Sequence, residues 1–393
     1  MKLFGLNLSS YLFVVAWFGM PGIVYGEYWY FEPEANFRLE FNDNRRLTLE
    51  PHESVWGTIV AGGVNVGAMS PRVELTLSPL LKFSDYSGGE NITYSDQFLN
   101  GALKINNEKA LWTLSGNYTR DTTIVSELED SGLVQFDNRR ESYDLKPSWT
   151  RAISSRINVG LNLSYRDVSY ENGLEIGLFD YTVNSLLGDI SFAASEKQQV
   201  GFAVFRSAFD VSDIDYVSDS YGAQLSITSN WSERIHTNIT GSFRYSDIAI
   251  ASFSGEIEES DRGWLFDAQL TSRLERGHVA VNISRSIDPS GLGTEVQRDR
   301  LRLSLYRPIR QRMSGTMALI AMHQEDIRES SATRARDYGR VSGDLQWRII
   351  PLWSLRAGYA FTMQRFENAD SEARSNSVYI QFEYAGRKQQ FAS

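Results

Sequence analysis

Apolar and polar residues alternate one by one along most of the chain after its first hundred positions. In residues 157–166, for example, Ile, Val, Leu, Leu and Tyr alternate with Asn, Gly, Asn, Ser and Arg. The same period of two recurs over residues 238–245, 279–284 and 300–305. Because successive side chains of a β-strand point to opposite faces, each run predicts a strand with one apolar and one polar face. A helix would instead group its apolar residues at spacings of three and four.

Two kinds of connection separate these runs. Short turns lie near residues 106–108, 154–155, 195–197, 232–234, 275–277, 310–311 and 351–352. Longer connections, which are acidic or contain Gly and Ser, span residues 123–138, 169–177, 212–218, 252–261, 288–295, 325–336 and 367–373. Successive short turns are about forty residues apart, which is the length of two strands and one longer loop. Tight turns on one side and long loops on the other are typical of an outer-membrane barrel.

The pattern therefore predicts an all-β fold: a transmembrane, antiparallel, up-and-down β-barrel of about 18 strands, with about 16 as the alternative. Residues 37–41, 55–60 and 73–83 supply the first three strands, and residues 42–52 form an external loop. A secreted, soluble β-sandwich or propeller is the rival interpretation. The alternating runs are longer than the five or six residues of an average soluble strand, which favours the barrel. Aromatic residues near strand ends, such as Trp112 and Trp347, fit a membrane-interface girdle.

Composition agrees with a two-faced sheet. The 393 residues are 12% aromatic and carry a net charge of −10, with no Cys, yet the mean hydropathy is −0.32. That hydropathy excludes a bundle of transmembrane helices. The lack of Cys excludes disulfide scaffolds, thiolate zinc sites and cysteine nucleophiles, and the acidic balance argues against nucleic acid as a partner.

The N-terminal residues 1–26 have the pattern of a secretory signal peptide. Lys2 precedes an apolar run at residues 12–18, and Val24 and Gly26 stand at positions −3 and −1 of a cleavage site that would leave Glu27 first. An anchor helix is the alternative, but the apolar run is shorter than the roughly twenty residues that such a helix needs. Residues 27–393 then form the barrel, in a bacterial outer membrane with its lipids as partners.

The second set of alternating positions is polar and would line the barrel lumen. An ionised residue that faces hydrocarbon costs several kcal/mol, so these side chains must face water or one another. Two interpretations follow: arginine–carboxylate pairs that brace the wall, or a wet passage whose arginines attract anionic or hydroxyl-rich solutes. The candidate lumen-lining residues are Arg166, Arg244, Asp267, Arg302, Arg340, Asp344, Arg348, Arg356 and Glu383.

No catalytic, cofactor or metal site is predicted. His52, His236, His278 and His323 are far apart, and none has a Cys or His neighbour at ligand spacing. Acidic stretches at 127–130 and 256–261 could hold divalent cations, although a solvated charged loop is the simpler interpretation of each.

Several strings resemble a family of β-barrel porins of Gram-negative outer membranes, including those that accompany exosortase and exopolysaccharide systems. They are GNYTRDTT at 116–123, RSIDPSGLG at 285–293 before DRLRLSL at 299–305, LRAGYAF at 355–361 and ARSNSVY at 373–379. The resemblance covers essentially the whole mature chain and implies a barrel linked to polysaccharide secretion. It implies no catalytic or binding residues. One departure is the tail after Tyr384: either the last strand ends there and the tail trails into the periplasm, or the strand extends to Phe391.

Three hypotheses for function follow. The first is a channel or export component for an extracellular polysaccharide, with periplasmic export proteins as partners. The second is a general or anion-leaning porin for small solutes. The third is a plugged structural barrel that anchors partner proteins through its acidic loops. The oligomeric state stays open.

Overall fold

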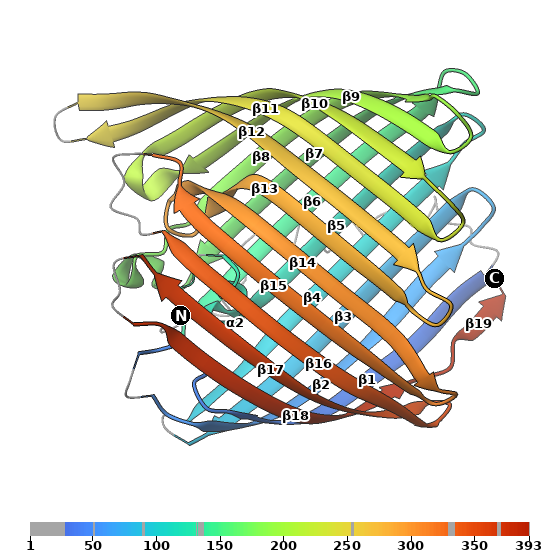
Figure 1. Cartoon of the computed structure of the whole chain (residues 1–393), viewed down its shortest axis with the longest axis vertical. Helices are drawn as coiled ribbons and strands as arrows, with labels where there is room; N and C mark the ends of the chain where they lie inside the picture. The colour runs from blue at the N-terminus through green and yellow to red at the C-terminus, as the bar shows by residue number, and fades with distance from the viewer. Residues whose placement is uncertain are drawn as a thin grey trace, which may run out of the picture.

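The chain folds as a closed β-barrel of eighteen long antiparallel strands (Figure 1). The computed structural model describes residues 28–49, 52–88, 91–130, 132, 137–252, 255–328, 335–367 and 371–392. The predicted signal peptide, residues 1–26, lies outside the described residues. Strand β1 pairs with β2 along one edge and with β18 along the other, where Phe37 faces Phe382, and this second pairing closes the barrel.

The strands are long and follow one another around the wall in chain order. They are β1 (Tyr28–Asn42), β2 (Val55–Met69), β3 (Val73–Ser87), β4 (Ile92–Asn106), β5 (Ala110–Thr122), β6 (Arg139–Ala152), β7 (Ile157–Tyr170), β8 (Tyr181–Ala193), β9 (Gln198–Val211), β10 (Tyr216–Asn230), β11 (Ile235–Ser252), β12 (Gly255–Arg273), β13 (His278–Ser290), β14 (Thr294–Arg310), β15 (Met313–Asp326), β16 (Arg336–Ile350), β17 (Trp353–Phe366) and β18 (Ala373–Ala385). Among the described residues, short helices lie in three connections: α2 (Thr123–Ser126), η1 (Gly173–Ile176) and η2 (Ser212–Ile214). The strand number and the antiparallel closure confirm the predicted fold class.

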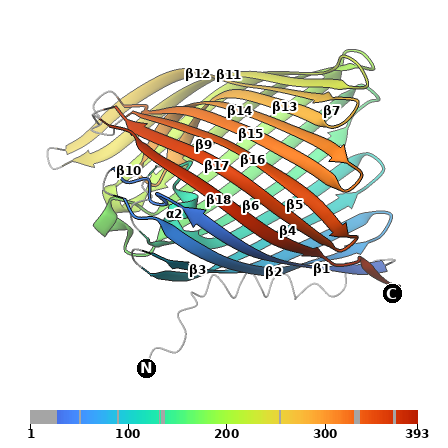
Figure 2. The ribbon, with the colours of Figure 1, turned by 60° about the horizontal axis from the view of Figure 1, so that its bottom comes forward.

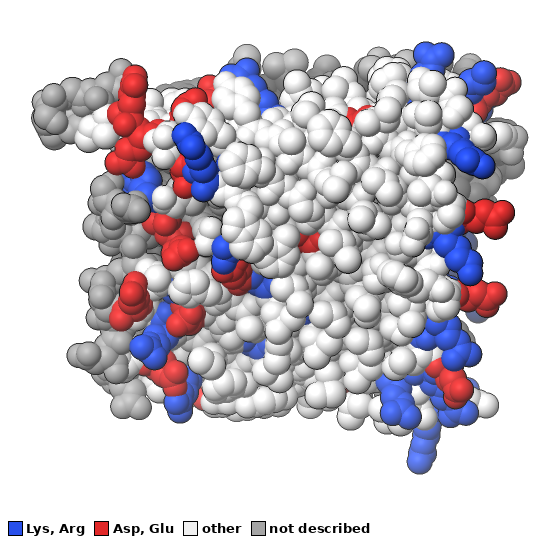
Figure 3. Space-filling view, turned by 45° about the horizontal axis from the view of Figure 1, so that its top comes forward, with Lys and Arg blue, Asp and Glu red and all other residues white. Residues whose placement is uncertain are grey.

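The alternation of the sequence places apolar side chains on the outer face of the barrel. Leu161, Ile239, Leu303 and Ile380, which belong to four different strands, are all exposed. On the face in Figure 3, most Lys, Arg, Asp and Glu side chains gather toward the two ends and leave an uncharged band between them. A closed barrel with such a band is how β-strands span a membrane, and the protein is located in the bacterial outer membrane. No helix among the described residues is long and apolar enough to cross a membrane.

The tight turns lie together at one end of the barrel and the longer connections at the other (Figures 1 and 2). In barrels of this class the tight turns are periplasmic and the long loops external. Two expected external loops are shorter than predicted. The ladder of β11 and β12 continues through the pair Ile250–Ile257, so most of residues 252–261 is strand. Residues 288–295 likewise belong mainly to β13 and β14, joined by residues 291–293.

The tail after Tyr384 returns to the barrel wall. Strand β18 ends at Ala385, and a short strand β19 (Gln389–Ala392) pairs with the start of β1, where Phe391 faces Trp29. The tail therefore follows neither of the two predicted paths, because it breaks at residues 386–388 and then continues as a separate strand along the same edge of β1.

Candidate functional site

The described part of the connection between β5 and β6 folds into the barrel. It begins with the single helical turn α2, in which the Glu127 amide donates to the Thr123 carbonyl at 2.9 Å. The amide of Gly132 donates to the Glu127 carbonyl at 2.7 Å, and Gly132 has a positive φ of 78°, which glycine adopts at little cost. We call residues 123–130 and 132 the crossing segment. Figures 1 and 2 show α2 inside the outline of the barrel, near the end that carries the long loops.

Arginines of the opposite wall bind the carboxylates of the crossing segment. Arg302 of β14 donates to Glu129 at 2.7 Å, and Arg298 of the same strand forms an ion pair with Asp130. Arg298 also lies 3.3 Å from Asp288 of β13. Because β14 is eight strands from β6 in the wall, these pairs carry the segment across the lumen.

A buried guanidinium fixes the backbone of the same segment. Arg336 of β16 is only 1% exposed. It donates to the carbonyls of Leu128 and Asp130, the latter at 3.3 Å, and to the side-chain oxygen of Gln364 at 3.1 Å. Gln364 of β17 in turn donates to the Gly132 carbonyl at 3.2 Å. A side chain at position 132 would clash with Arg336, so glycine is needed there for close approach as well as for its backbone conformation.

Glu127, which directly follows α2, also holds the crossing segment in place. Glu127 is fully buried, and its carboxylate accepts a hydrogen bond from the Tyr170 hydroxyl at 2.8 Å and lies 3.6 Å from Arg140. The simpler interpretation of residues 127–130, a solvated acidic loop, is therefore wrong. Their carboxylates contact arginines and a tyrosine because desolvated carboxylates need compensating charges or donors.

The lumen beside β7 to β11 is filled by apolar side chains. Val168, Phe209, Tyr216 and Ile248 point inward from four strands and pack with Leu178 of the β7–β8 connection. The β13–β14 turn joins this packing, since the Phe179 amide donates to the Gly291 carbonyl at 2.8 Å. The inward face is thus not uniformly polar, as the alternation had suggested.

A buried ion pair lies beneath this apolar cluster. Arg244 of β11 donates to both carboxylate oxygens of Glu295 of β14, at 2.6 and 2.7 Å. Ser220 accepts from Arg244 at 2.9 Å, and Ser218 donates to Glu295 at 2.6 Å. Arg244, one of the predicted lumen residues, is buried and binds this carboxylate instead of facing open water.

On the other side of the crossing segment lies a polar cavity of about 540 Å³. Its walls are the crossing segment and inward residues of β1, β2, β3, β16, β17 and β18. Four cationic residues and two carboxylates line it: Arg38, Arg45, Lys82, Arg340, Glu40 and Glu129. The cavity is therefore cationic on balance.

Each cation of this cavity has a different environment. Arg38 lies 2.5 Å from Glu40, and Lys82 lies 2.9 Å from the buried Asp96. Arg45 stacks on the ring of Tyr86 at 3.5 Å. Burial lowers the pKa of the Arg45 guanidinium, which nevertheless stays charged at neutral pH.

The other predicted lumen residues form cross-strand pairs along the wall. Arg356 is central, at 3.1 Å from Asp344 and 2.9 Å from Glu383. Arg166 lies 2.8 Å from Asp144. Each of these pairs joins neighbouring strands of the wall.

The four remaining predicted residues occupy separate places. Asp267 accepts a hydrogen bond from Asn282 at 2.7 Å. Arg348 is exposed near the periplasmic end of β16, away from the cavity. Arg302 contacts Glu129 of the crossing segment, and Arg340 lines the cavity.

The sequence interpretation missed most of the side chains that bind the crossing segment or line the cavity beside it. It did not single out Arg298, Arg336, Arg38 or Lys82. One available signal was the period-two series of arginines at positions 298, 300 and 302, all of which face inward on one strand.

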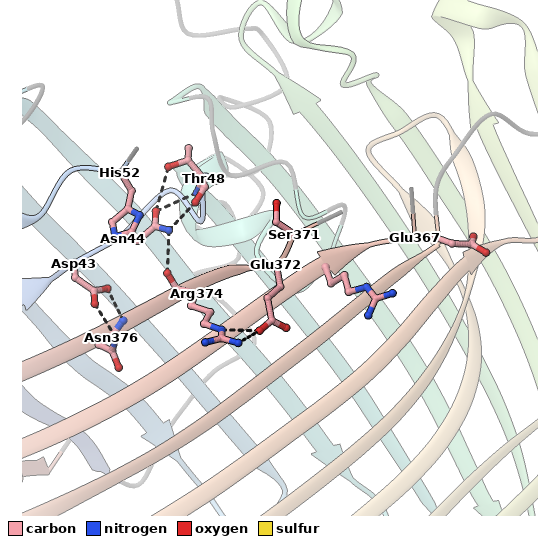
Figure 4. Close-up of a pocket in the computed structure, with 10 residues that line it drawn as sticks. Asp43, Asn44, Thr48, His52, Glu367, Ser371, Glu372, Arg374 and Asn376 are labelled. Atoms are coloured by element: carbon pink, nitrogen blue, oxygen red, sulfur yellow. Dashed lines mark hydrogen bonds and ion pairs between the residues drawn. The ribbon is translucent and has the colours of Figure 1, made fainter. Parts of the chain in front are cut away.

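A second polar pocket lies at the external end of the β1–β18 pairing that closes the barrel (Figure 4). Here Asp43 binds the backbone amide and the side chain of Asn376 at 2.6 and 2.7 Å, and Asn44 donates to the Arg374 carbonyl at 2.9 Å. Arg374 is paired with Glu372. These contacts tie the β1–β2 connection to β18 and are structural.

Comparisons with known proteins add little to this description. No protein-family model matches the chain, and no curated protein matches it. Among solved structures, it is similar to OccK5 (OpdH) of Pseudomonas aeruginosa, with 10% identity, a TM-score of 0.45 and coverage of 91% of this chain and 98% of that one. It is also similar to a BenF-like porin from Pseudomonas fluorescens Pf-5, with 10% identity, a TM-score of 0.48 and coverage of 91% and 99%. For OccAB4 of Acinetobacter baumannii the values are 8%, 0.46, 94% and 100%. Values this low support no conclusion about mechanism, and the comparisons lend no support to the expected exopolysaccharide link.

Proposed function

We propose that this barrel is an outer-membrane channel for small solutes, with a preference for anions. The observation that carries the proposal is the division of the lumen by the crossing segment. One side is filled by the apolar cluster that includes Val168 and Phe209. The other side holds the polar cavity of about 540 Å³, so solutes would pass between the crossing segment and the walls formed by β1–β3 and β16–β18.

The charges of the cavity favour anions. Arg38, Arg45, Lys82 and Arg340 outnumber Glu40 and Glu129, and no carboxylate among the described residues forms an ion pair with Arg340. Rings of Arg and Lys in a narrow pore favour anions because the low-dielectric wall screens them poorly. The carboxylates keep the pore hydrated and prevent an anion from binding too tightly to leave.

A wide passage for polymer is harder to reconcile with the crossing segment. Its anchors, Arg298 and Arg336, are nearly fully buried, so the segment would have to leave a network of ion pairs and hydrogen bonds before a wide opening formed. The hypothesis of polysaccharide export therefore has less structural support than the small-solute channel.

Conductance of the purified barrel in planar lipid bilayers tests the proposal. We expect stable single-channel openings, and in a KCl gradient a reversal potential displaced toward the chloride equilibrium potential. A barrel that inserts and stays silent would instead support the plugged structural role. A reversal potential displaced toward the potassium equilibrium potential would refute the anion preference.

A further inference from the structure

A cationic hollow of about 640 Å³ lies on the barrel wall at its periplasmic end. It is bounded by the β2–β3 turn, the β4–β5 turn and the adjoining ends of β5 and β6. Its charged lining residues are Arg72, Lys109, Arg151 and Glu108. The three cations are exposed, and among the described residues none of them has a carboxylate partner in an ion pair. The hollow therefore holds more positive charge than the protein itself neutralises.

Two tryptophans form the wall of this hollow on the side of the membrane. Trp112 of β5 and Trp149 of β6 are direct cross-strand partners, with ring centroids 5.9 Å apart. Trp112 is 51% exposed. It stands on the outward-facing positions of β5, as does Leu114 two residues further into the membrane. Tryptophan side chains on an outer barrel face gather at the level of the lipid headgroups.

The whole periplasmic end is cationic, although the protein is acidic. The connections at this end hold nine Lys and Arg residues against four Glu residues: Arg72, Lys109, Arg156, Lys197, Arg234, Arg276, Arg312, Arg387 and Lys388 against Glu108, Glu196, Glu233 and Glu275. The net charge of the chain is −10, so the acidic surplus lies elsewhere. Negatively charged groups are thus attracted to this end, and the hollow can bind one of them specifically.

We propose that the hollow binds the phosphate of an anionic phospholipid in the periplasmic leaflet. Arg72, Lys109 and Arg151 would surround the phosphate, because guanidinium groups bind phosphate oxygens in pairs and an ammonium adds a point charge. The acyl chains would continue past Trp112 along the outward leucines of β4 and β5, such as Leu103 and Leu114. A free phosphate ion would contact only the three cations, whereas a phospholipid would also contact Trp112 and the outward leucines through its acyl chains.

Native mass spectrometry of the detergent-released full-length barrel tests this assignment. The barrel is mixed with phosphatidylglycerol or with phosphatidylcholine of the same acyl chains. We expect phosphatidylglycerol to remain bound in preference, and Lys109→Gln to weaken it about fivefold, which corresponds to about 1 kcal/mol for one cation near an anionic lipid. The triple variant Arg72→Gln/Lys109→Gln/Arg151→Gln should lose the preference. Arg276→Gln, an exposed arginine of another periplasmic turn that does not line the hollow, should keep it.

Each result of this experiment either supports or contradicts lipid binding in the hollow. All three substituted side chains are exposed, so the variants should fold, and the mobility shift of an unheated barrel on a gel checks this. Equal retention of the two lipids by the unaltered protein would overturn the proposal, as would an unchanged preference in the folded triple variant. Displacement of phosphatidylglycerol by millimolar inorganic phosphate would contradict a lipid as the ligand, because a lipid that is also held by its acyl chains should outcompete phosphate at that concentration.

Discussion

Two acidic connections at the external end of the barrel have similar sequences, but one enters the lumen and the other extends the wall. The crossing segment contains Glu127, Glu129 and Asp130, and it lies inside the lumen. The β11–β12 hairpin contains Glu258 and Asp261, and it continues the wall as regular strands beyond its neighbours (Figure 1). Both were interpreted from sequence as solvated loops.

The difference lies in what each stretch can pair with. Inward-facing arginines of β14 and β16, such as Arg298 and Arg336, meet the crossing segment and compensate for the desolvation of its carboxylates and carbonyls. The β11–β12 hairpin instead satisfies its backbone within its own ladder, through pairs such as Asp247–Ser260. An acidic loop enters a barrel where the opposite wall supplies donors, and it stays outside where its own strands can continue.

Removal of the crossing segment should give the largest effect. A variant in which a short Gly–Ser turn replaces residues 123–137 should conduct several times more current per channel, because the crossing segment then no longer obstructs the lumen. The matched control shortens the β11–β12 hairpin by residues 250–257, and its conductance should equal that of the unaltered barrel. Equal conductance of the two variants in planar bilayers would contradict the contrast between the stretches.

Loss of one anchor should destabilise the barrel strongly. Arg298→Gln leaves Asp130 without its charged partner in a buried environment, which costs about 3 kcal/mol. The matched control is Arg206→Gln, which breaks an exposed pair with Asp219 at 3.0 Å and should leave the free energy of unfolding nearly unchanged, because solvent screens an exposed pair. Urea unfolding in lipid vesicles measures both. Similar losses in the two variants would mean that the Arg298–Asp130 pair does not anchor the crossing segment.

The filled side of the lumen should respond in stability and not in conductance. Arg244→Met leaves Glu295 buried without its charged partner, so the free energy of unfolding should fall by about 3 kcal/mol. The double variant Arg244→Met/Glu295→Leu should recover most of that loss, because a buried pair can be replaced by apolar groups at little cost. Single-channel conductance should stay unchanged in both. A rise in conductance would show that solutes also pass on this side.

The smallest effect concerns selectivity. Arg340→Gln removes one cation from the cavity, so the reversal potential in a KCl gradient should move a few millivolts toward the potassium value while the conductance stays similar. Arg348→Gln, an arginine on the same strand outside the cavity, should leave the reversal potential unchanged. A larger shift for Arg348→Gln would place the selective part of the pore near the periplasmic end.

The wall of the barrel could be predicted from sequence because it depends on local alternation. The positions of Leu161 and Ile239 on the outer face follow from period two alone. The crossing segment could not be predicted, because its partners are distant in the chain: Asp130 and Arg298 are 168 residues apart, and Leu128 and Arg336 are 208 apart. Alternation says which residues face inward, but not which loop occupies the space they enclose.

The apolar cluster in the lumen was missed for a related reason. Val168 and Phe209 occupy inward positions near strand ends, where an apolar residue breaks the alternation and was assigned no role. Such breaks are a usable signal, since an inward apolar residue must be covered by a loop. In this barrel the covering residues, Leu178 and Phe179, lie in a connection that follows one of those strands directly.

Crosslinking across the lumen tests the position of the crossing segment most directly. The chain has no Cys, so cysteines placed by Glu129→Cys and Arg302→Cys are the only reactive thiols. If Glu129 lies beside Arg302, a short bismaleimide should join the two cysteines rapidly in the folded barrel, and the product should migrate as a closed loop on a denaturing gel. The control pair Glu258→Cys/Arg302→Cys, with one cysteine on the β11–β12 hairpin, should not react. Failure of the first pair to crosslink in a folded barrel, or equal reaction of both pairs, would contradict a segment that crosses the lumen.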